Sequence, residues 1–222
     1  MNISKGTISK QYLNNEAEKI FNLQGFFYIQ GELRFRRYLE IKRKNVILAK
    51  NDLSVIMMNP GSSKPKSIDE NSFTDCFNKF IKAEPDTTLM QIMRVMENCN
   101  FNYAKIVNLS DVRTTKSTDF FKLLKSDLKN NIDHSIFFDP DKYDLKNYLN
   151  QQSVFIYAWG VDERLKKIAR QALEVLYTYG SKKIGIPHSI NQYGYYHPLP
   201  RGKEKQIKWV DTITRMIKDN YQ

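Results

Sequence analysis

Apolar and polar residues follow two patterns along this chain, and together the patterns predict an α/β fold. Short, nearly continuous apolar runs lie at 53–58, 104–109, 153–158 and 182–186. Such runs are typical of strands that are buried on both faces. The segments between them carry apolar residues at helical spacing. Alternation of strand and helix favours a mostly parallel sheet with helices on both faces.

Helical spacing occurs in five segments, and each predicts one amphipathic helix. We expect the last helix at roughly 203–218 and a helix stop at Gly180. The apolar positions of the five segments are Ile68, Phe73, Cys76, Phe77, Phe80 and Ile81; Leu89, Ile92, Met93 and Met96; Phe120, Phe121, Leu124 and Leu128; Leu165, Ile168, Ala169, Ala172, Leu173 and Leu176; and Ile207, Val210, Ile213 and Ile217.

The amino-terminal part has a different pattern, in which "FFYIQG" and "LRFRRYLEIKR" predict an antiparallel hairpin. We assign residues 1–50 to a basic, aromatic extension and residues 51–222 to the α/β core. No Gly/Ser-rich or Pro-rich linker divides the 222 residues, so we expect one domain. The sequence also lacks a leader and an apolar run of transmembrane length, which predicts a soluble, cytoplasmic protein without membrane contact.

Charge narrows the class of partner. The chain has 35 Lys and Arg against 24 Asp and Glu, a formal net charge of +11. This balance favours a polyanion as the partner, although a generally basic, solvated surface would explain it too. Aromatic residues among the basic ones, as in "QYGYYHPLPRGK", suit stacking on bases. Two cysteines, Cys76 and Cys99, are too few for a disulfide framework or a four-cysteine metal site. We expect core thiols, no metal and no cofactor.

The predicted strands end in unusual residues. The first ends in "VIMMNPGSS", where Pro60 and Gly61 force the chain out of the sheet directly after Asn59. The second ends in "VNLSDVRT" with Asn108, and the fourth leads to "HPLPRG" with His197. The carboxyl ends of parallel strands meet at one edge, where ligands of open α/β sheets bind. The plain alternative is a set of polar turns.

These motifs, in this order, resemble the uracil-DNA glycosylase superfamily. Within it the chain is most similar to the mismatch-specific branch with Asn-Pro-Gly and to a related family of uncharacterised bacterial and phage proteins. "MMNPGSS", "IVNLSDVRT", "IYAWG" and "YHPLPRG" carry the resemblance. It implies a three-layer α/β/α sandwich on a short, mostly parallel four-stranded sheet, with the N-terminal β-hairpin as an extension. It also implies a bacterial or phage-encoded protein that acts on DNA, and we expect a monomer.

The resemblance implies a monofunctional DNA glycosylase with two catalytic residues. Asn59 would hold the attacking water, and His197 would donate a hydrogen bond to the pyrimidine O2 as the base leaves. Asn108 would read the edge of the base, since a carboxamide offers a donor and an acceptor. Structural alternatives stay open for two of these residues: His197 could cap a turn, and Asn108 could fix one.

The sequence departs from the uracil-selective members of the superfamily in the first motif. Those members have an Asp in place of Asn59 and a bulky Tyr soon after it that excludes a C5 methyl group. Here Gly61, Ser62 and Ser63 are small and would form the C5 side of the base-recognition site. We therefore expect a C5-modified pyrimidine, such as hydroxymethylated or glucosylated cytosine, with uracil and mispaired thymine as alternatives. The role would be DNA repair or defence against phage DNA.

Four further residues are candidates for contact with DNA. Leu199 could wedge into the base stack when the target base flips out, and Arg201 could contact a phosphate or the orphaned partner base. Lys203 and Lys64 are further candidates for binding DNA. Of the other histidines, we expect His188 to be structural and His134 to lie at the surface.

Two rival functions remain. One is a catalytically silent nucleic-acid-binding module of the same fold. The other is a hydrolase of free nucleosides or nucleotides, which would not need a dispersed basic surface.

Overall fold

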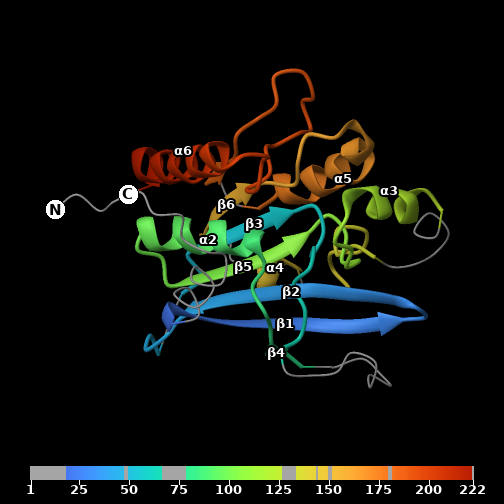
Figure 1. The fold of residues 1–222 in the computed structure, drawn as a ribbon, viewed down its shortest axis with the longest axis horizontal. Helices are drawn as coiled ribbons and strands as arrows, with labels where there is room; N and C mark the ends of the chain where they lie inside the picture. Colours follow the sequence, from blue (N-terminus) through green and yellow to red (C-terminus); the bar gives the residue numbers. More distant parts are fainter. Residues whose placement is uncertain are drawn as a thin grey trace.

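The computed structural model describes residues 19–47, 50–66, 79–126, 134–143, 145–149, 152–179 and 182–221, and the seven strands within them form one mixed sheet (Figure 1). The strand order is β4-β1-β2-β5-β3-β6-β7. The fold is therefore α/β, as the alternation of strands and helices predicts.

The parallel half of the sheet confirms the four strands predicted from apolar runs. They are β3 (Leu53–Met57), β5 (Tyr103–Asn108), β6 (Val154–Tyr157) and β7 (Lys183–Ile184). Strand β3 pairs in parallel with both β5 and β6, and β6 pairs in parallel with β7. Every residue of β3 and β6 is buried. Their carboxyl ends consequently share one edge of the sheet.

The antiparallel half corrects the predicted four-stranded sheet. The hairpin forms as expected from β1 (Phe21–Gln30) and β2 (Leu33–Arg43), but β2 pairs with β5 and so continues the central sheet. A short strand, β4 (Ile81–Lys82), pairs with β1 at the outer edge. The helix predicted across 68–81 therefore does not reach Ile81, while residues 67–78 lie outside the described part. Leu128 and Gly180 lie outside it too.

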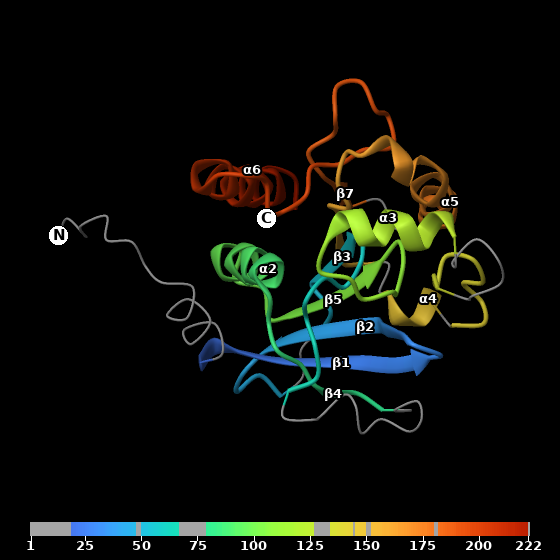
Figure 2. The same cartoon turned by 45° about the vertical axis from the view of Figure 1, so that its right-hand side comes forward.

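Helices cover both faces of the sheet (Figure 2). One face carries α2 (Thr87–Asn98) and α6 (Lys203–Tyr221). The other carries α3 (Ser117–Lys125), α4 (Leu145–Tyr148) and α5 (Lys166–Tyr177), with the 3₁₀ turn Glu163–Leu165 before α5. Helix α2 starts where the carboxylate of Asp86 accepts a hydrogen bond from the Leu89 amide at 2.9 Å. None of the helices in the described ranges has both the length and the apolar character needed to cross a bilayer.

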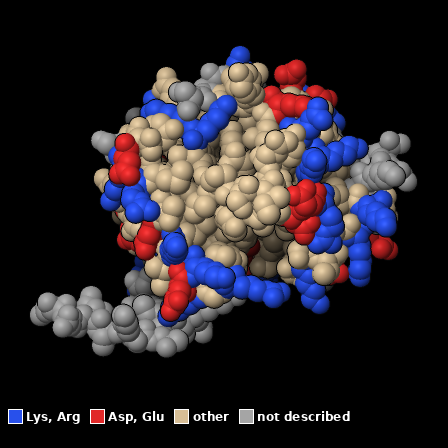
Figure 3. Space-filling model, turned by 90° about the horizontal axis from the view of Figure 1, so that it is seen from above, with Lys and Arg blue, Asp and Glu red and all other residues tan. Residues whose placement is uncertain are grey.

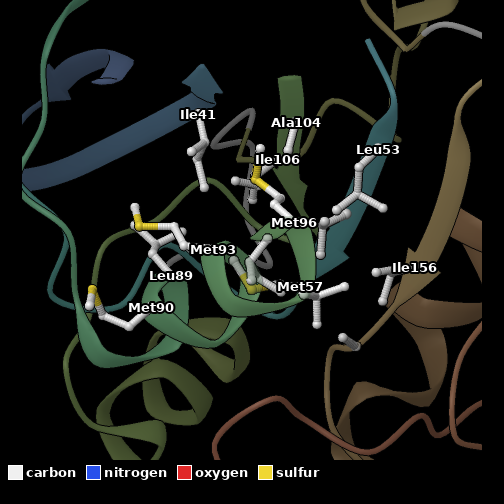
Figure 4. Close-up of a cluster of buried hydrophobic side chains, with 14 of the residues drawn as sticks. Ile41, Leu53, Met57, Leu89, Met90, Met93, Met96, Ala104, Ile106 and Ile156 are labelled. Carbon is white, nitrogen blue, oxygen red and sulfur yellow. The ribbon is translucent and has the colours of Figure 1, made fainter. Parts of the chain in front are cut away.

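The core under α2 and α6 is rich in aliphatic side chains and methionine (Figure 4). Alternate residues of each central strand point to this side, including Leu53, Val55 and Met57 of β3. Helix α2 supplies Leu89, Met90, Met93 and Met96, among other residues, from its buried face. Cys99 is buried there as well, in agreement with a core thiol. This packing holds the carboxyl edge of the parallel strands against the start of α2.

Truncation of Ile106 should test this core. The side chain is fully buried, so Ile106→Ala should lower the free energy of unfolding by about 2–5 kcal/mol through lost burial and a residual cavity. Urea unfolding followed by circular dichroism measures the change. Ile190, which is 87% exposed, provides the matched control, because Ile190→Ala should change stability by less than about 0.5 kcal/mol. Equal losses in the two variants would contradict this core.

Candidate active site

The candidate site lies where the chain leaves β3 and β5. Asn108, the last residue of β5, is in register with Met57 of β3, and Asn59 follows two residues later. Backbone hydrogen bonds from Leu109 to Met57 and from Ser110 to Met58 extend the pairing beyond the strands. The two asparagines predicted to act together therefore come from adjacent strands at the same edge.

The carboxamide of Asn59 has a fixed orientation. Its Nδ2 donates to the backbone oxygen of Thr114 at 3.0 Å and to Thr114 Oγ1 at 2.8 Å, with a longer contact of 3.4 Å to Val112 O. Among the described residues, none donates a hydrogen bond to Oδ1. Since the residue is also partly exposed, Oδ1 can accept a hydrogen bond from a water or a ligand.

The side chain of Asn108, unlike that of Asn59, is buried and makes no hydrogen bond to the described residues. Its side chain is fully buried, and neither Oδ1 nor Nδ2 has a hydrogen-bond partner in the described part of the chain. A buried polar group without a partner costs about 1–3 kcal/mol. The predicted alternative, an Asn that fixes a turn, requires hydrogen bonds that this side chain does not make. The arrangement suits a ligand that supplies both a donor and an acceptor.

Arg36 of β2 is a second buried polar group at this edge, and the sequence analysis missed it. Its side chain is fully buried, and none of its three guanidinium nitrogens has a hydrogen-bond partner among the described residues. Burial lowers the pKa of Arg36 to about 10, partly offset by the nearby carboxylate of Asp86. Because that value is still well above neutral pH, the guanidinium keeps its positive charge.

The Asn-Pro-Gly turn packs against the start of α2. Gly61 has φ +63°, in the left-handed region that favours glycine, and a Cβ built on it would lie 2.9 Å from Oδ2 of Asp86. A side chain at Gly61 would therefore strain the turn. The glycine is needed both for the backbone conformation and for the close approach of Asp86.

Ser62 and Ser63, also predicted on the C5 side of a pocket, differ in exposure. Ser62 is exposed. Ser63 is buried, and its hydroxyl donates to the backbone oxygen of Glu84 at 3.0 Å, while its own backbone oxygen accepts from Arg113 Nε at 2.9 Å. Ser63 thus ties the turn to the segments around it, and Ser62 is the serine whose hydroxyl is accessible.

His197 lies in the long loop between β7 and α6. This loop folds back over the end of β6, since Gly160 pairs with Tyr195 and the Trp159 indole donates to Tyr193 O at 2.8 Å. The Trp209 indole of α6 holds Tyr196 O at 2.9 Å. The loop thus spans the β6–β7 side of the carboxyl edge. No direct contact joins His197 to either asparagine among the described residues.

The imidazole of His197 can donate a hydrogen bond from Nε2. Its Nδ1 accepts a hydrogen bond from the Leu199 amide at 3.1 Å, which places the proton of the neutral ring on Nε2. Burial lowers the pKa of His197 to about 4. The side chain is therefore a neutral donor at physiological pH, and the same hydrogen bond also caps a turn, so both predicted roles fit its geometry.

The residues predicted to contact DNA are accessible. Arg201 and Lys203 are exposed at the start of α6, and Leu199 is partly exposed. Lys64 is exposed, and its ammonium lies 3.6 Å from the Glu84 carboxylate. The molecule seen from above shows Lys and Arg around a broad uncharged area, with acidic residues among them (Figure 3). The basic charge on this face is dispersed.

The remaining histidines have structural contacts. His134 is buried, with Nδ1 at 3.0 Å from Ser110 Oγ, so the prediction of a surface position is wrong. His188 Nδ1 accepts from the Asn191 amide at 3.0 Å, which agrees with a structural role. Among the described residues, no group of three or more His, Cys, Asp or Glu could hold a metal ion.

The fixed amide of Asn59 predicts that aspartate cannot replace it. In Asn59→Asp a carboxylate oxygen would face the backbone oxygen of Thr114, and the donated hydrogen bond would be lost. We expect the free energy of unfolding to fall by about 1–3 kcal/mol. Urea unfolding measures it, with Ser62→Asp as a control that adds the same charge at the exposed neighbouring turn. Equal stability of Asn59→Asp and wild type would contradict the assigned amide orientation.

The lowered pKa of His197 can be measured by NMR titration of its ring protons. The folded protein should titrate near pH 4, against 6.5 for the ordinary side chain. Because the folded pKa is lower, the stability that the neutral ring contributes is present above pH 6.5 and is lost as the pH falls towards 4. The wild type should therefore lose more stability over this interval than His197→Gln. A folded-state midpoint at or above 6.5 would show that the ring is not desolvated.

Comparison with known proteins gives a family but no activity. No curated protein and no solved structure matches the chain. One family model, described as a protein of unknown function, DUF1643, matches residues 37–199. This range includes both asparagines and His197 and covers more than half of the sequence. The chain belongs to the DUF1643 family.

Proposed function

We propose that this protein is a monofunctional DNA glycosylase that hydrolyses the N-glycosidic bond of a flipped-out pyrimidine. The observation that carries the proposal is the position of two asparagines, Asn59 and Asn108, at the same edge of the sheet. Asn108 is buried with both carboxamide atoms unpaired, and Asn59 on the adjacent segment has an oxygen available to accept a hydrogen bond. A base edge would satisfy the first, and a water the second.

The proposed reaction needs orientation more than deprotonation. The water oxygen bonds to C1′ while the C1′–N1 bond breaks, and the bonding electron pair leaves with the base. The water loses a proton to solvent or to the departing base. An asparagine is too weak a base to take that proton, but it can hold the water in line with C1′. Fixed by Thr114, the Asn59 carboxamide loses little further freedom when the water binds.

Negative charge on the departing base requires hydrogen-bond donors. His197 is neutral and carries its proton on Nε2, so it would donate a hydrogen bond to O2 of the base. The loop that carries it would have to approach Asn59 when DNA binds. Leu199 would fill the space left by the flipped base, and Arg201, Lys203 and Lys64 would bind the backbone.

The resemblance to the uracil-DNA glycosylase superfamily supports the same reaction. Its motifs coincide with the carboxyl ends of β3, β5 and β6 and with the loop after β7. The helices on both faces of the sheet are compatible with the three-layer sandwich of that superfamily. The small residues Gly61 and Ser62 favour a C5-modified pyrimidine. Removal of such bases would serve DNA repair or defence against phage DNA in the bacterial cytoplasm.

A catalytically silent nucleic-acid-binding module is the competing function. The exposed basic residues and the dispersed positive charge would serve it equally well. Such a module has no use for a buried carboxamide without partners, which lowers stability. The unpaired state of Asn108 therefore favours the enzyme.

Excision from defined oligonucleotides tests the proposal. The panel carries uracil, a thymine mismatch, 5-hydroxymethylcytosine or glucosylated cytosine, and alkali then cleaves the abasic sites. We expect strand cleavage for at least one base, with the C5-substituted bases accepted. Asn59→Ala should keep duplex affinity and lose most turnover, because the charge that binds DNA lies elsewhere. Asn59→Ala that turns over like the wild type would contradict the role of Asn59, and DNA binding without excision of any base would favour the silent module.

A further inference from the structure

Arg36 faces the same side of the sheet as Asn108. In the register of the hairpin it lies opposite Phe27, whose ring belongs to the core beneath α2 and α6. Asn108 lies in register with Met57, which belongs to the same core. Registered residues of neighbouring strands point to the same face. The amide of Arg36 donates to Asp111 O at 2.8 Å, just beyond the end of β5. The two unpaired side chains therefore come from adjacent strands, on one face and at one end.

Charged groups of both signs act on Arg36. Arg113 contributes a second guanidinium on this face, 5.4 Å from the Phe27 ring, and raises the local potential. Asp86 is the carboxylate that most favours charged Arg36, but its Oδ1 already caps α2 through the Leu89 amide. Asp111 forms an ion pair with Arg37 at 2.9 Å. Asp86 and Asp111 therefore favour the charged guanidinium through space, but neither accepts a hydrogen bond from it.

An unpaired charge of this kind lowers stability. A guanidinium without hydrogen bonds loses its hydration and gains no hydrogen bond in return, so an apolar side chain of similar volume would suit the same place better. Burial nonetheless leaves Arg36 protonated. Its retention in the fold is explained if a ligand brings acceptor atoms and negative charge to it, as a departing pyrimidine anion would.

We propose that Arg36 donates hydrogen bonds to the pyrimidine as it leaves and stabilises the negative charge that develops on the base. This inference rests on the proposed glycosylase activity. When the C1′–N1 bond breaks, the electron pair spreads from N1 to the exocyclic O2 and, through the ring, to O4 of uracil or thymine or to N3 of cytosine. The guanidinium would interact with that charge at a site from which water is excluded, while Asn108 reads the base. His197 and Arg36 would then act on different atoms of the same anion.

The inference predicts opposite effects on stability and on rate. Arg36→Met should raise Tm in the absence of DNA, because it removes a buried charged group whose nitrogens have no hydrogen-bond partner among the described residues. The same variant should excise the preferred base about 10²–10³-fold more slowly in single turnover, the usual loss for one donor to a developing oxyanion. Arg36→Lys should keep part of the rate. Arg34→Met, at an exposed position near the turn of the hairpin, should leave rate and Tm close to those of the wild type.

The leaving group separates this role from a structural one. The rates are compared for the base that the wild type removes and for an analogue with an electron-withdrawing ring substituent, such as 5-fluorouracil against uracil. The electron-withdrawing substituent makes the anion of the departing base more stable, so its release depends less on a hydrogen-bond donor. The rate of Arg36→Met should therefore fall less on the analogue. An equal loss on both bases, or a lower Tm without DNA, would overturn the inference while leaving the glycosylase standing. A wild type that releases no base from any oligonucleotide would overturn both.

Discussion

Two buried polar side chains without partners are the constraint on which this account depends. Folding normally satisfies buried donors and acceptors, and exceptions in native proteins tend to mark functional sites. Asn108 and Arg36 are both fully buried, and neither has a side-chain hydrogen bond within the described part of the chain. Their position on one face, at the carboxyl ends of parallel strands, is also where ligands of α/β sheets bind.

The mixed sheet explains how these two side chains meet. Parallel pairing of β3 and β5 places Asn59 and Asn108 together. Antiparallel pairing of β2 with β5 runs the hairpin in the opposite direction, so the early part of β2 reaches the same edge. Arg36 can only be part of the site because the hairpin belongs to the sheet.

Much of the fold follows from the sequence because apolar runs and helical spacing are local signals. The four parallel strands, the hairpin and the helices α2, α3, α5 and α6 were all predictable in this way. Strand β4 was not, since Ile81 also fits the helical spacing of the segment before it. The pairing of β2 with β5 depends on contacts between distant segments, which no local pattern records.

The site could be predicted only in part, for a related reason. Asn59, Asn108 and His197 stand next to Pro, Gly or strand ends, where unusual residues attract attention. Arg36 stands among other basic residues in "LRFRRYLEIKR", where a solvated side chain is the natural interpretation. A register irregularity between Phe26 and Phe27 shifts the alternation in this hairpin, so its buried position could not be read from the spacing. His134 stands in the polar stretch "NNIDHS", which favours a surface position and gives no local sign of its burial.

A crystal structure of the protein with the free pyrimidine that it releases would test the central claim most directly. The account predicts that the base lies between β3 and the start of α2, with its edge on the Asn108 carboxamide and a carbonyl oxygen on the Arg36 guanidinium. It also predicts a water on Oδ1 of Asn59. A structure in which ordered waters or other protein groups satisfy Asn108 and Arg36, with the base bound elsewhere, would contradict it.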